Sequence, residues 1–208
     1  MKREGILVVI SGFAGTGKGS IVKGLMEQYD QYALSVSMTT RNPRPGEQDG
    51  ISYFFVSKER FEEEIENQGL IEYACYCDNY YGTPKKYVEQ QLAEGKDVIL
   101  EIEIQGALQV RKIFPTALLL FVMPPSAEEL KRRLVGRGTE TPEVVEKRMQ
   151  RAAKEAEGIE EYDYIVVNDV LEDCVKSTHG IIEAAHQKPM RNEAFIQSIR
   201  SGLSAITQ

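Results

Sequence analysis

A glycine-rich segment with one lysine is the first feature of this 208-residue chain that could do chemistry. Two glycines and the lysine stand at the P-loop spacing within Gly12-Phe13-Ala14-Gly15-Thr16-Gly17-Lys18-Gly19-Ser20. Glycines let consecutive N–H groups turn inward around an anion, and the positive end of a following helix strengthens that binding. Lys18 adds a full charge for the outer phosphates. The segment therefore predicts a site for nucleotide phosphates.

One position departs from the P-loop pattern. A serine or threonine normally follows the lysine, whereas Gly19 stands here and Ser20 comes next. We therefore expect Mg²⁺ to be held mostly through phosphate oxygens and water, with Ser20 as a candidate ligand.

A second group of polar residues lies downstream, in a proline-stiffened stretch and the residues after it. Arg41 and Arg44 are three apart, and arginine makes forked, charge-assisted bonds to phosphate oxygens. Tyrosine hydroxyls can hold a phosphate without adding charge, and a carboxylate such as Glu72 can accept two N–H bonds from a guanine edge. Arginines, tyrosines and one acid in a small region suit guanosine monophosphate (GMP).

The elements that must position these residues follow from the hydrophobic pattern. Continuous apolar runs at 6–10, 97–100, 118–122 and 164–167 are each followed by a helical pattern. Such strands are typical of a parallel sheet buried on both faces, with right-handed crossovers. The helix over 19–29 places four residues on one stripe, namely Ile21, Val22, Leu25 and Met26. We predict a three-layer α/β fold of the P-loop type.

Two segments interrupt this alternation. Residues 35–83 hold short candidate strands at 53–56 and 70–73 around a helix at 58–67, which predicts an inserted subdomain of mixed strands. Residues 127–157 are charged and broken by Gly136-Arg137-Gly138, which predicts a helical lid. The core is then 1–34, 84–126 and 158–187, and 188–208 is an extension that we expect to form a short polar helix.

From Ile6 to about Ala185 the chain resembles the guanylate kinase family. The most specific match is the run Ser35-Val36-Ser37-Met38-Thr39-Thr40-Arg41-Asn42-Pro43-Arg44-Pro45-Gly46-Glu47, which other nucleoside monophosphate kinases lack. Further matches are Tyr53, Ile71-Glu72-Tyr73, Asn79-Tyr80-Tyr81-Gly82, Ile104-Gln105-Gly106, Pro124-Pro125-Ser126, Gly136-Arg137-Gly138-Thr139-Glu140 and Val167-Asn168-Asp169.

The resemblance implies roles at matching positions. The GMP-phosphate ligands would be Arg41, Arg44, Tyr53 and Tyr81, and the guanine contacts Ser37, Glu72 and Thr83. It also implies that ATP would be bound by the loop from Gly12 to Ser20 and by the lid residues Arg133 and Arg137. Asn168 would lie near the adenine. The groups that oppose charge on the transferring phosphoryl would be Lys18, Arg41, Arg137 and Arg148.

Two acids, Glu101 and Glu103, follow the run at 98–100. Strand alternation would point Glu101 and Glu103 the same way, toward the carboxyl edge of the sheet. Many relatives have aspartate at one or both places. We expect Glu101 near the water shell of Mg²⁺ and Glu103 near the acceptor base.

Some departures and alternatives stay open. Phe13-Ala14 replace a common Pro-Ser, and Met38 replaces a small polar residue. Arg133 could instead be a helix arginine paired with Glu129 at i,i+4.

The implied activity is ATP-dependent phosphorylation of GMP, and of dGMP, to the diphosphate in purine nucleotide metabolism, with Mg²⁺ as cofactor. One rival is a non-catalytic guanylate-kinase-like binding module, but such modules lose the P-loop lysine or the lid arginines. Another is a kinase for a different small phosphate ester, against which Glu72 and the tyrosines argue. The expected partners are ATP, ADP, GMP and GDP, and the oligomeric state is open.

The bulk properties restrict other functions. A net charge of -7 argues against a protein that coats nucleic acid. No apolar stretch is long enough to cross a bilayer and no signal peptide is expected, so we predict a cytoplasmic protein. The cysteines (Cys75, Cys77 and Cys174) are expected to be reduced packing residues, and His179 and His186 to serve surface or helix-packing roles.

Overall fold

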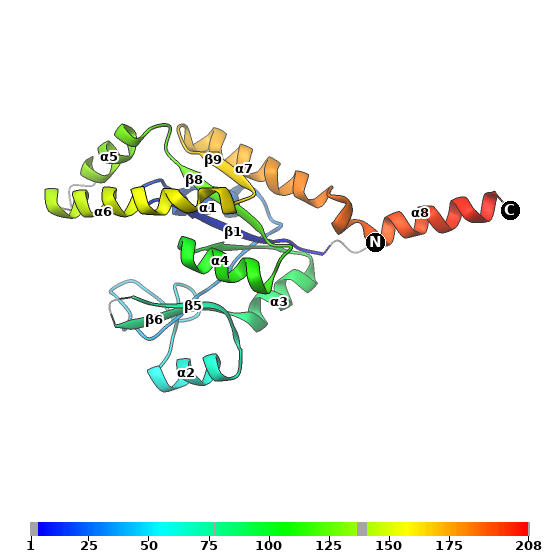
Figure 1. Cartoon of the computed structure of the whole chain (residues 1–208). Helices are drawn as coiled ribbons and strands as arrows, with labels where there is room; N and C mark the ends of the chain where they lie inside the picture. Colours follow the sequence, from blue (N-terminus) through cyan, green and yellow to red (C-terminus); the bar gives the residue numbers. More distant parts are fainter. Residues whose placement is uncertain (1–3, 77, 137–140, 208) are drawn as a thin grey trace.

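The computed structural model describes residues 4–76, 78–136 and 141–207, and it is an α/β protein built around a parallel sheet (Figure 1). The sheet has the strand order β2-β7-β1-β8-β9. Its strands are β1 (Leu7–Gly12), β2 (Tyr32–Leu34), β7 (Asp97–Glu101), β8 (Leu118–Met123) and β9 (Tyr164–Val167), all paired in parallel. The three-layer α/β prediction is confirmed.

Helices cover both faces of this sheet. One apolar cluster joins β1 and β8 to α1 (Lys18–Gln28) and α7 (Leu171–His186), while a second joins β1 and β7 to α3 (Lys85–Glu94) and α4 (Ile104–Ile113). The two clusters alternate along β1, because successive side chains of a strand point to opposite faces. The two histidines of α7 make different contacts: His179 stacks on Tyr29, as a packing residue would, whereas His186 Nε2 hydrogen-bonds to the buried carboxylate of Asp97 at 2.9 Å.

A continuous apolar run did not mean burial in every strand. β1, β8 and the apolar part of β7 are buried, as expected, apart from the partly buried Met123. In β9 only Val166 is buried, because this strand is the edge of the sheet and one of its faces is open. On α1 the predicted stripe is wrong by one residue, since Met26 is exposed.

A second, four-stranded sheet lies between the central sheet and α2 (Lys58–Glu66), as the lower part of Figure 1 shows. Its order is β4-β3-β6-β5, from β3 (Met38–Thr39), β4 (Phe54–Phe55), β5 (Leu70–Tyr76) and β6 (Asn79–Pro84). Pairing is parallel between β3 and β4 and antiparallel elsewhere. Met38 packs with Phe61 and Leu70 in its own small core, which accounts for an apolar residue at that position.

Two helices cover one end of the central sheet, α5 (Ala127–Gly136) and α6 (Pro142–Glu155), followed by the 3-10 turn η1 (Ala156–Glu161). They pack on Phe13 and Phe121 through Leu130, Leu134 and Val145. The connection at 137–140, with the predicted residue Arg137, lies outside the described residues.

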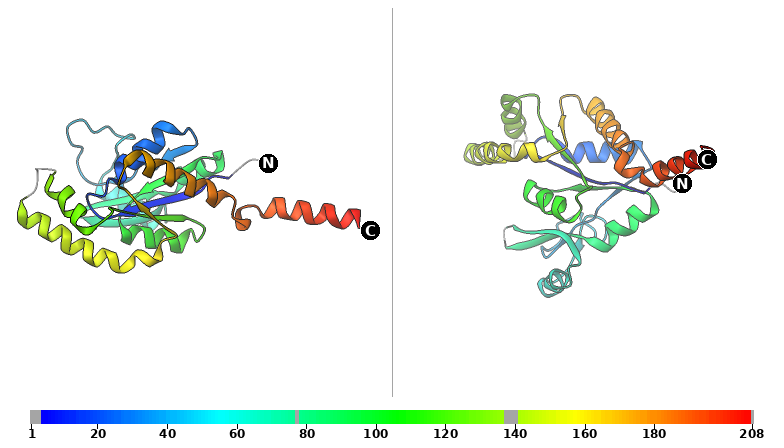
Figure 2. Two further views of the ribbon diagram at one scale, coloured as in Figure 1. Left: turned by 90° about the horizontal axis from the view of Figure 1, so that it is seen from above. Right: turned by 45° about the vertical axis from the view of Figure 1, so that its right-hand side comes forward.

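The chain ends in η2 (Pro189–Arg191) and α8 (Glu193–Ile206). Figure 2 shows α8 leading away from the body beyond α7. The prediction of a polar helix is wrong, because α8 carries an apolar stripe that includes Phe195, Ile199 and Leu203. None of the helices in the described part of the chain is long and apolar enough to cross a membrane. Cys75 is exposed rather than packed, Cys174 is buried, and Cys77 lies outside the described residues.

Candidate active site

The glycine-rich loop joins the carboxyl end of β1 to the first turn of α1. Gly17 takes φ 84° as the residue before the helix, and a Cβ there would lie 2.6 Å from Asn168 Nδ2. A Cβ on Gly12 would lie 2.1 Å from the Val122 carbonyl oxygen of the adjacent strand. Only glycine fits these two places, so the loop is forced into a tight turn that leads into the N-terminus of α1.

Hydrogen bonds hold this loop in shape. Lys18 Nζ donates to the carbonyl oxygens of Gly12 (2.7 Å) and Phe13 (3.2 Å), so the lysine lies over the loop. Thr16 is buried and donates to the Phe13 carbonyl, while Asn168 Nδ2 donates to the Thr16 carbonyl at 2.7 Å. The Asn168 amide, which is 6% exposed, therefore braces the glycine-rich loop itself.

The departure at Phe13 has a structural explanation. Its ring is buried and meets Phe121 edge-on, with centroids 5.0 Å apart, and it packs with Leu130 and Leu134 of α5. The loop is thus attached to the predicted lid segment by an apolar contact rather than by a hydroxyl. Ala14 and Gly15 stay partly exposed above it, and Gly19 and Ser20 are exposed.

Glu101 ends β7 close to the loop. Its Oε2 lies 3.6 Å from where a Cβ on Gly19 would be, so Gly19 leaves room for this carboxylate beside the helix start. Loss of solvent raises the pKa of Glu101, while the charge of Lys18 lowers it and that of Glu103 raises it. Glu101 and Lys18 therefore interact beside Gly19, the residue that precedes Ser20.

Strand alternation does not extend to Glu103, because β7 ends at Glu101 and Glu103 is the residue before α4. Its carboxylate forms an ion pair with Arg151 of α6 at 2.8 Å. Glu103 thus connects the start of α4 to the predicted lid.

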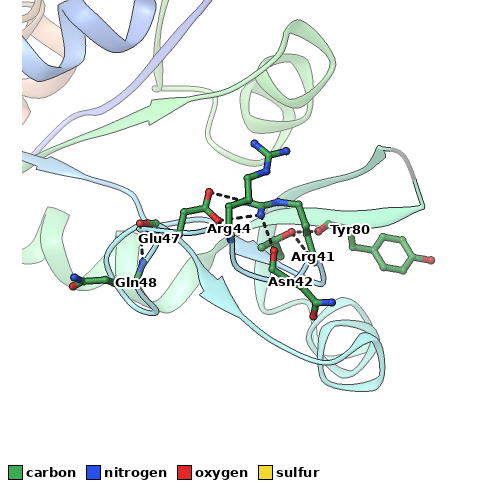
Figure 3. A network of polar contacts seen from close by, with 8 residues as sticks. Arg41, Asn42, Arg44, Glu47, Gln48 and Tyr80 are labelled. Carbon is green, nitrogen blue, oxygen red and sulfur yellow. Dashed lines mark hydrogen bonds and ion pairs between the residues drawn. The ribbon is translucent and has the colours of Figure 1, made fainter.

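The second sheet carries the arginine cluster, which Figure 3 shows from close by. The Arg41 guanidinium makes a two-pronged contact with Glu47 at 2.8 and 3.0 Å and donates to the Asn42 carbonyl at 2.7 Å. It also lies over the ring of Tyr53, 5.4 Å from the centroid. Glu47 raises the pKa of Arg41, and Arg41 in turn holds the pKa of Glu47 below its usual range.

Glu47 was not among the predicted site residues. Besides binding Arg41, it accepts a hydrogen bond from the Arg44 backbone N–H at 2.7 Å and so closes the loop between them. Its signal in the sequence was its place at the end of the arginine- and proline-containing run. The Arg44 guanidinium points away from this pair in Figure 3 and has no hydrogen-bond or ion-pair partner within the described ranges.

The other residues predicted to bind GMP lie around these arginines and along β5 and β6. Tyr53 and Tyr81 meet edge-on with centroids 6.1 Å apart, beside Arg41. Glu72 is 7% exposed, and one of its oxygens accepts a 2.7 Å bond from the fully buried Thr83 hydroxyl. Burial raises the pKa of Glu72 and the Thr83 bond opposes that rise. Ser37 lies at the edge of β3, where its carbonyl accepts from Phe54 N.

The arginines of the predicted lid, residues 127–157, have different surroundings. Arg133 Nε donates to Glu129 at 2.6 Å, which is the i,i+4 pairing left open from the sequence. Arg132 and Arg133 together hold the pKa of Glu129 at about 2. Arg148 is partly buried on α6. Arg137 lies outside the described residues.

The structure therefore defines a class of protein: a parallel α/β domain with a glycine-rich loop between a buried strand and a helix, and a second small sheet beside an arginine and tyrosine cluster with one buried acid. The family model described as guanylate kinase matches residues 4–185 of the chain. The chain belongs to the guanylate kinase family.

Individual relatives agree with this placement. The guanylate kinase of Latilactobacillus sakei subsp. sakei is 51% identical over 192 residues, covering 92% of this chain and 95% of the relative. That of Oceanobacillus iheyensis is 47% identical over 205 residues and covers 98% of this chain and all of the relative. The crystal structure of guanylate kinase from Anaplasma phagocytophilum superposes with a TM-score of 0.73 at 32% identity, covering 92% of this chain and 91% of that one.

Proposed function

We propose that this chain transfers the γ-phosphoryl group of ATP to GMP, giving ADP and GDP, and that dGMP is a second acceptor. The observation that carries the proposal is the buried pair of Glu72 and Thr83 on the same small sheet as Tyr81, against which the loop residues Arg41 and Tyr53 lie. A buried carboxylate can accept the N1–H and N2–H of guanine, while the arginines and tyrosines suit a phosphate. Family membership supports the same acceptor.

The acceptor phosphate would be bound by Arg41, Arg44, Tyr53 and Tyr81, and the base by Ser37, Glu72 and Thr83, with Glu103 close by. Arg41 would exchange its contact with Glu47 for the phosphate, which offers the same pair of acceptor oxygens. Glu47 therefore holds the guanidinium in a ready geometry before the nucleotide enters.

The donor would be bound by the loop from Gly12 to Ser20. A GMP phosphate oxygen attacks the γ-phosphorus in line, the bond to the bridging oxygen breaks, and ADP leaves with that oxygen. The acceptor is already an anion at neutral pH, so positioning and charge neutralisation carry the catalysis rather than a strong base. Lys18 and Arg41 would oppose the charge on the transferring group, together with Arg137 and Arg148.

The corner beside Gly19 fits a divalent metal with hard oxygen ligands. Glu101 and the exposed Ser20 offer a carboxylate and a hydroxyl, which are oxygen donors of the kind Mg²⁺ takes in phosphate sites, where it keeps several waters. A bound Mg²⁺ would neutralise charge on the ATP phosphates. Glu101 would hold its water shell, and the charge of Lys18 would oppose the rise in the Glu101 pKa that burial causes.

We further propose three working parts in the chain. The core is 1–34, 84–126 and 158–187, the GMP-binding part is 35–83, and the lid is 127–157. Closure of the last two would exclude water and suppress ATP hydrolysis. Arg133 would reach ATP only after its bond to Glu129 opens, and Asn168 would hold the loop near the adenine. We place the reaction in cytoplasmic purine nucleotide metabolism.

A substrate panel tests the proposal. GMP, dGMP, AMP, UMP and CMP are each supplied with MgATP, and ADP formation is followed by a coupled assay. We expect turnover with GMP and dGMP and little with the others. Binding of GMP without any turnover would instead indicate a non-catalytic module, and preferred turnover of another monophosphate would reject the guanine role of Glu72.

A further inference from the structure

The C-terminal helix α8 exposes several large apolar side chains to solvent. No residue of α8 is buried, and the large apolar side chains that it and η2 expose are Met190 (59%), Phe195 (53%), Ile199 (49%), Leu203 (58%) and Ile206 (82%). The matched family region ends at residue 185, so α8 lies beyond it. Figures 1 and 2 show α8 projecting from the body with no other element beside it.

An isolated helix of this composition is not stable on its own. Helices shorter than about 12–15 residues are marginal in water, and α8 has 14. It has no side-chain bond at its N-cap, and Gly202 lies in its interior, where glycine costs about 1 kcal/mol relative to alanine. Packing of the apolar stripe against a partner would supply the stability that the isolated helix lacks.

The spacing of the stripe indicates what kind of partner fits. Ile196, Ile199, Leu203 and Ile206 follow the 3-4-3 spacing of a coiled-coil seam, and the same spacing continues back to Asn192 and Pro189. At the base of α8 is a groove of about 320 Å³, lined by Pro189, Met190, Glu193, Ile196, Gln197 and Arg200. The helix therefore has an apolar half at its C-terminal end and an open, shallow hollow at its N-terminal end.

We propose that α8 pairs antiparallel with α8 of a second copy of this chain, around a two-fold axis. Leu203 and Ile206 of each copy occupy the groove beside Pro189 and Met190 of the other. In this register Ile196 faces Ile199 of the second copy, and Phe195 lies over Gly202, where a built Cβ meets nothing within 4 Å. Large and small side chains then interlock, as seams of this kind require.

Charge favours a second copy over other occupants. The only charged residues of α8 are Glu193 and Arg200, and the same register brings Glu193 of one copy opposite Arg200 of the other. The helix is thus electrically self-complementary. A membrane-surface helix would instead carry a polar face rich in lysine and arginine, whereas this polar face holds Gln197, Ser198 and Ser201.

The exposed area also matches a dimer. The five exposed side chains amount to roughly 500–600 Å² of apolar surface per copy, taking about 200 Å² for a whole large side chain. A standard interface uses about 800 Å² per partner, of which about 60% is apolar. The stripe and groove therefore supply the apolar part of one standard interface.

Sedimentation equilibrium of the full chain tests the proposal. We expect a monomer–dimer equilibrium, and we expect Leu203→Glu to leave only monomer at the same concentrations. The matched control is Ser201→Glu, which adds the same charge on the face of α8 opposite the seam and should keep the dimer. Circular dichroism of each variant checks that the body is folded.

Charge reversal tests the register. Glu193→Arg and Arg200→Glu should each weaken the dimer about 10-fold, and the double variant should return to within about 3-fold of the original chain. If the original chain is a monomer, the proposal is overturned. The same holds if the monomer binds phosphatidylglycerol vesicles in a flotation assay, because α8 would then dock on a membrane surface. A dimer that survives Leu203→Glu also overturns the proposal, because its interface lies elsewhere. Failure of the double variant to recover rejects the antiparallel register.

Discussion

Glu72→Gln is the change that separates recognition of the base from all other steps. Glu72 is 7% exposed, and one oxygen is held by Thr83 at 2.7 Å. The other oxygen lies 2.9 Å from where a Cβ on Gly106 would be, so it faces the glycine at the start of α4. Glutamine has the same size and keeps the Thr83 bond, but it offers an NH₂ group where guanine needs an acceptor.

The expected loss follows from the bonds that are removed. A hydrogen bond to a charged group contributes about 1.5–3 kcal/mol, and guanine would make two of them to Glu72. We expect a loss of about 3–5 kcal/mol, which is roughly a 100- to 5,000-fold fall in kcat/KM for GMP. The KM for ATP should stay within about 2-fold, because Glu72 does not contact the phosphate loop.

The assay compares GMP with inosine monophosphate, which lacks the 2-amino group. The original chain should prefer GMP strongly, and Glu72→Gln should lose most of that preference. Glu66→Gln, an exposed change in the adjacent helix α2, is the control. An unchanged preference for GMP in Glu72→Gln would refute the assignment of the base site.

The same residue predicts a pH dependence. Burial raises the pKa of Glu72 in the folded chain above its unfolded value. The ionised form therefore costs stability at high pH, and this cost disappears as pH falls through the raised pKa. GMP affinity should fall in that same window because binding needs the ionised form, and Glu72→Gln should abolish this contribution in a KM-against-pH profile.

Three further changes test the phosphate loop. Lys18→Ala should lower kcat by about 100-fold or more with little change in melting temperature, because it removes charge on the outer phosphates; near-normal turnover would reject the loop assignment. Phe13→Ala should destabilise the chain by about 3–5 kcal/mol in urea unfolding, since the ring is buried against Phe121; a loss below 1 kcal/mol, about the size of a surface change, would mean that the ring is not a core contact. Gly17→Ala should reduce both ATP binding by calorimetry and stability, because a Cβ at φ 84° meets Asn168; normal ATP affinity would contradict the loop geometry.

Much of the fold could be read from local patterns. The runs at 6–10, 97–100 and 118–122 are buried strands because continuous apolar sequence suits the interior of a parallel sheet. The run at 164–167 looked the same, yet β9 is an edge strand with most of its residues exposed. The order of strands in the sheet depends on long crossover connections, which a short stretch of sequence does not reveal. The prediction of a polar helix at 188–208 was wrong for another reason. Serines and a glycine separate the apolar residues along the sequence, and only the helix brings those residues onto one side.

The sequence by itself determined the types and spacing of the chemical groups: the glycines and lysine of the loop, the two arginines, the tyrosines and the acid Glu72. These features lie in short segments, where local geometry and family resemblance are sufficient. Only the tertiary structure decided which groups meet across long separations. It placed Asn168 on the Thr16 carbonyl, Phe13 under α5, Glu103 on Arg151, and Glu72 beside Thr83 and Gly106. Such contacts depend on how strands and helices far apart in the chain pack together, and a one-dimensional pattern does not encode that packing explicitly.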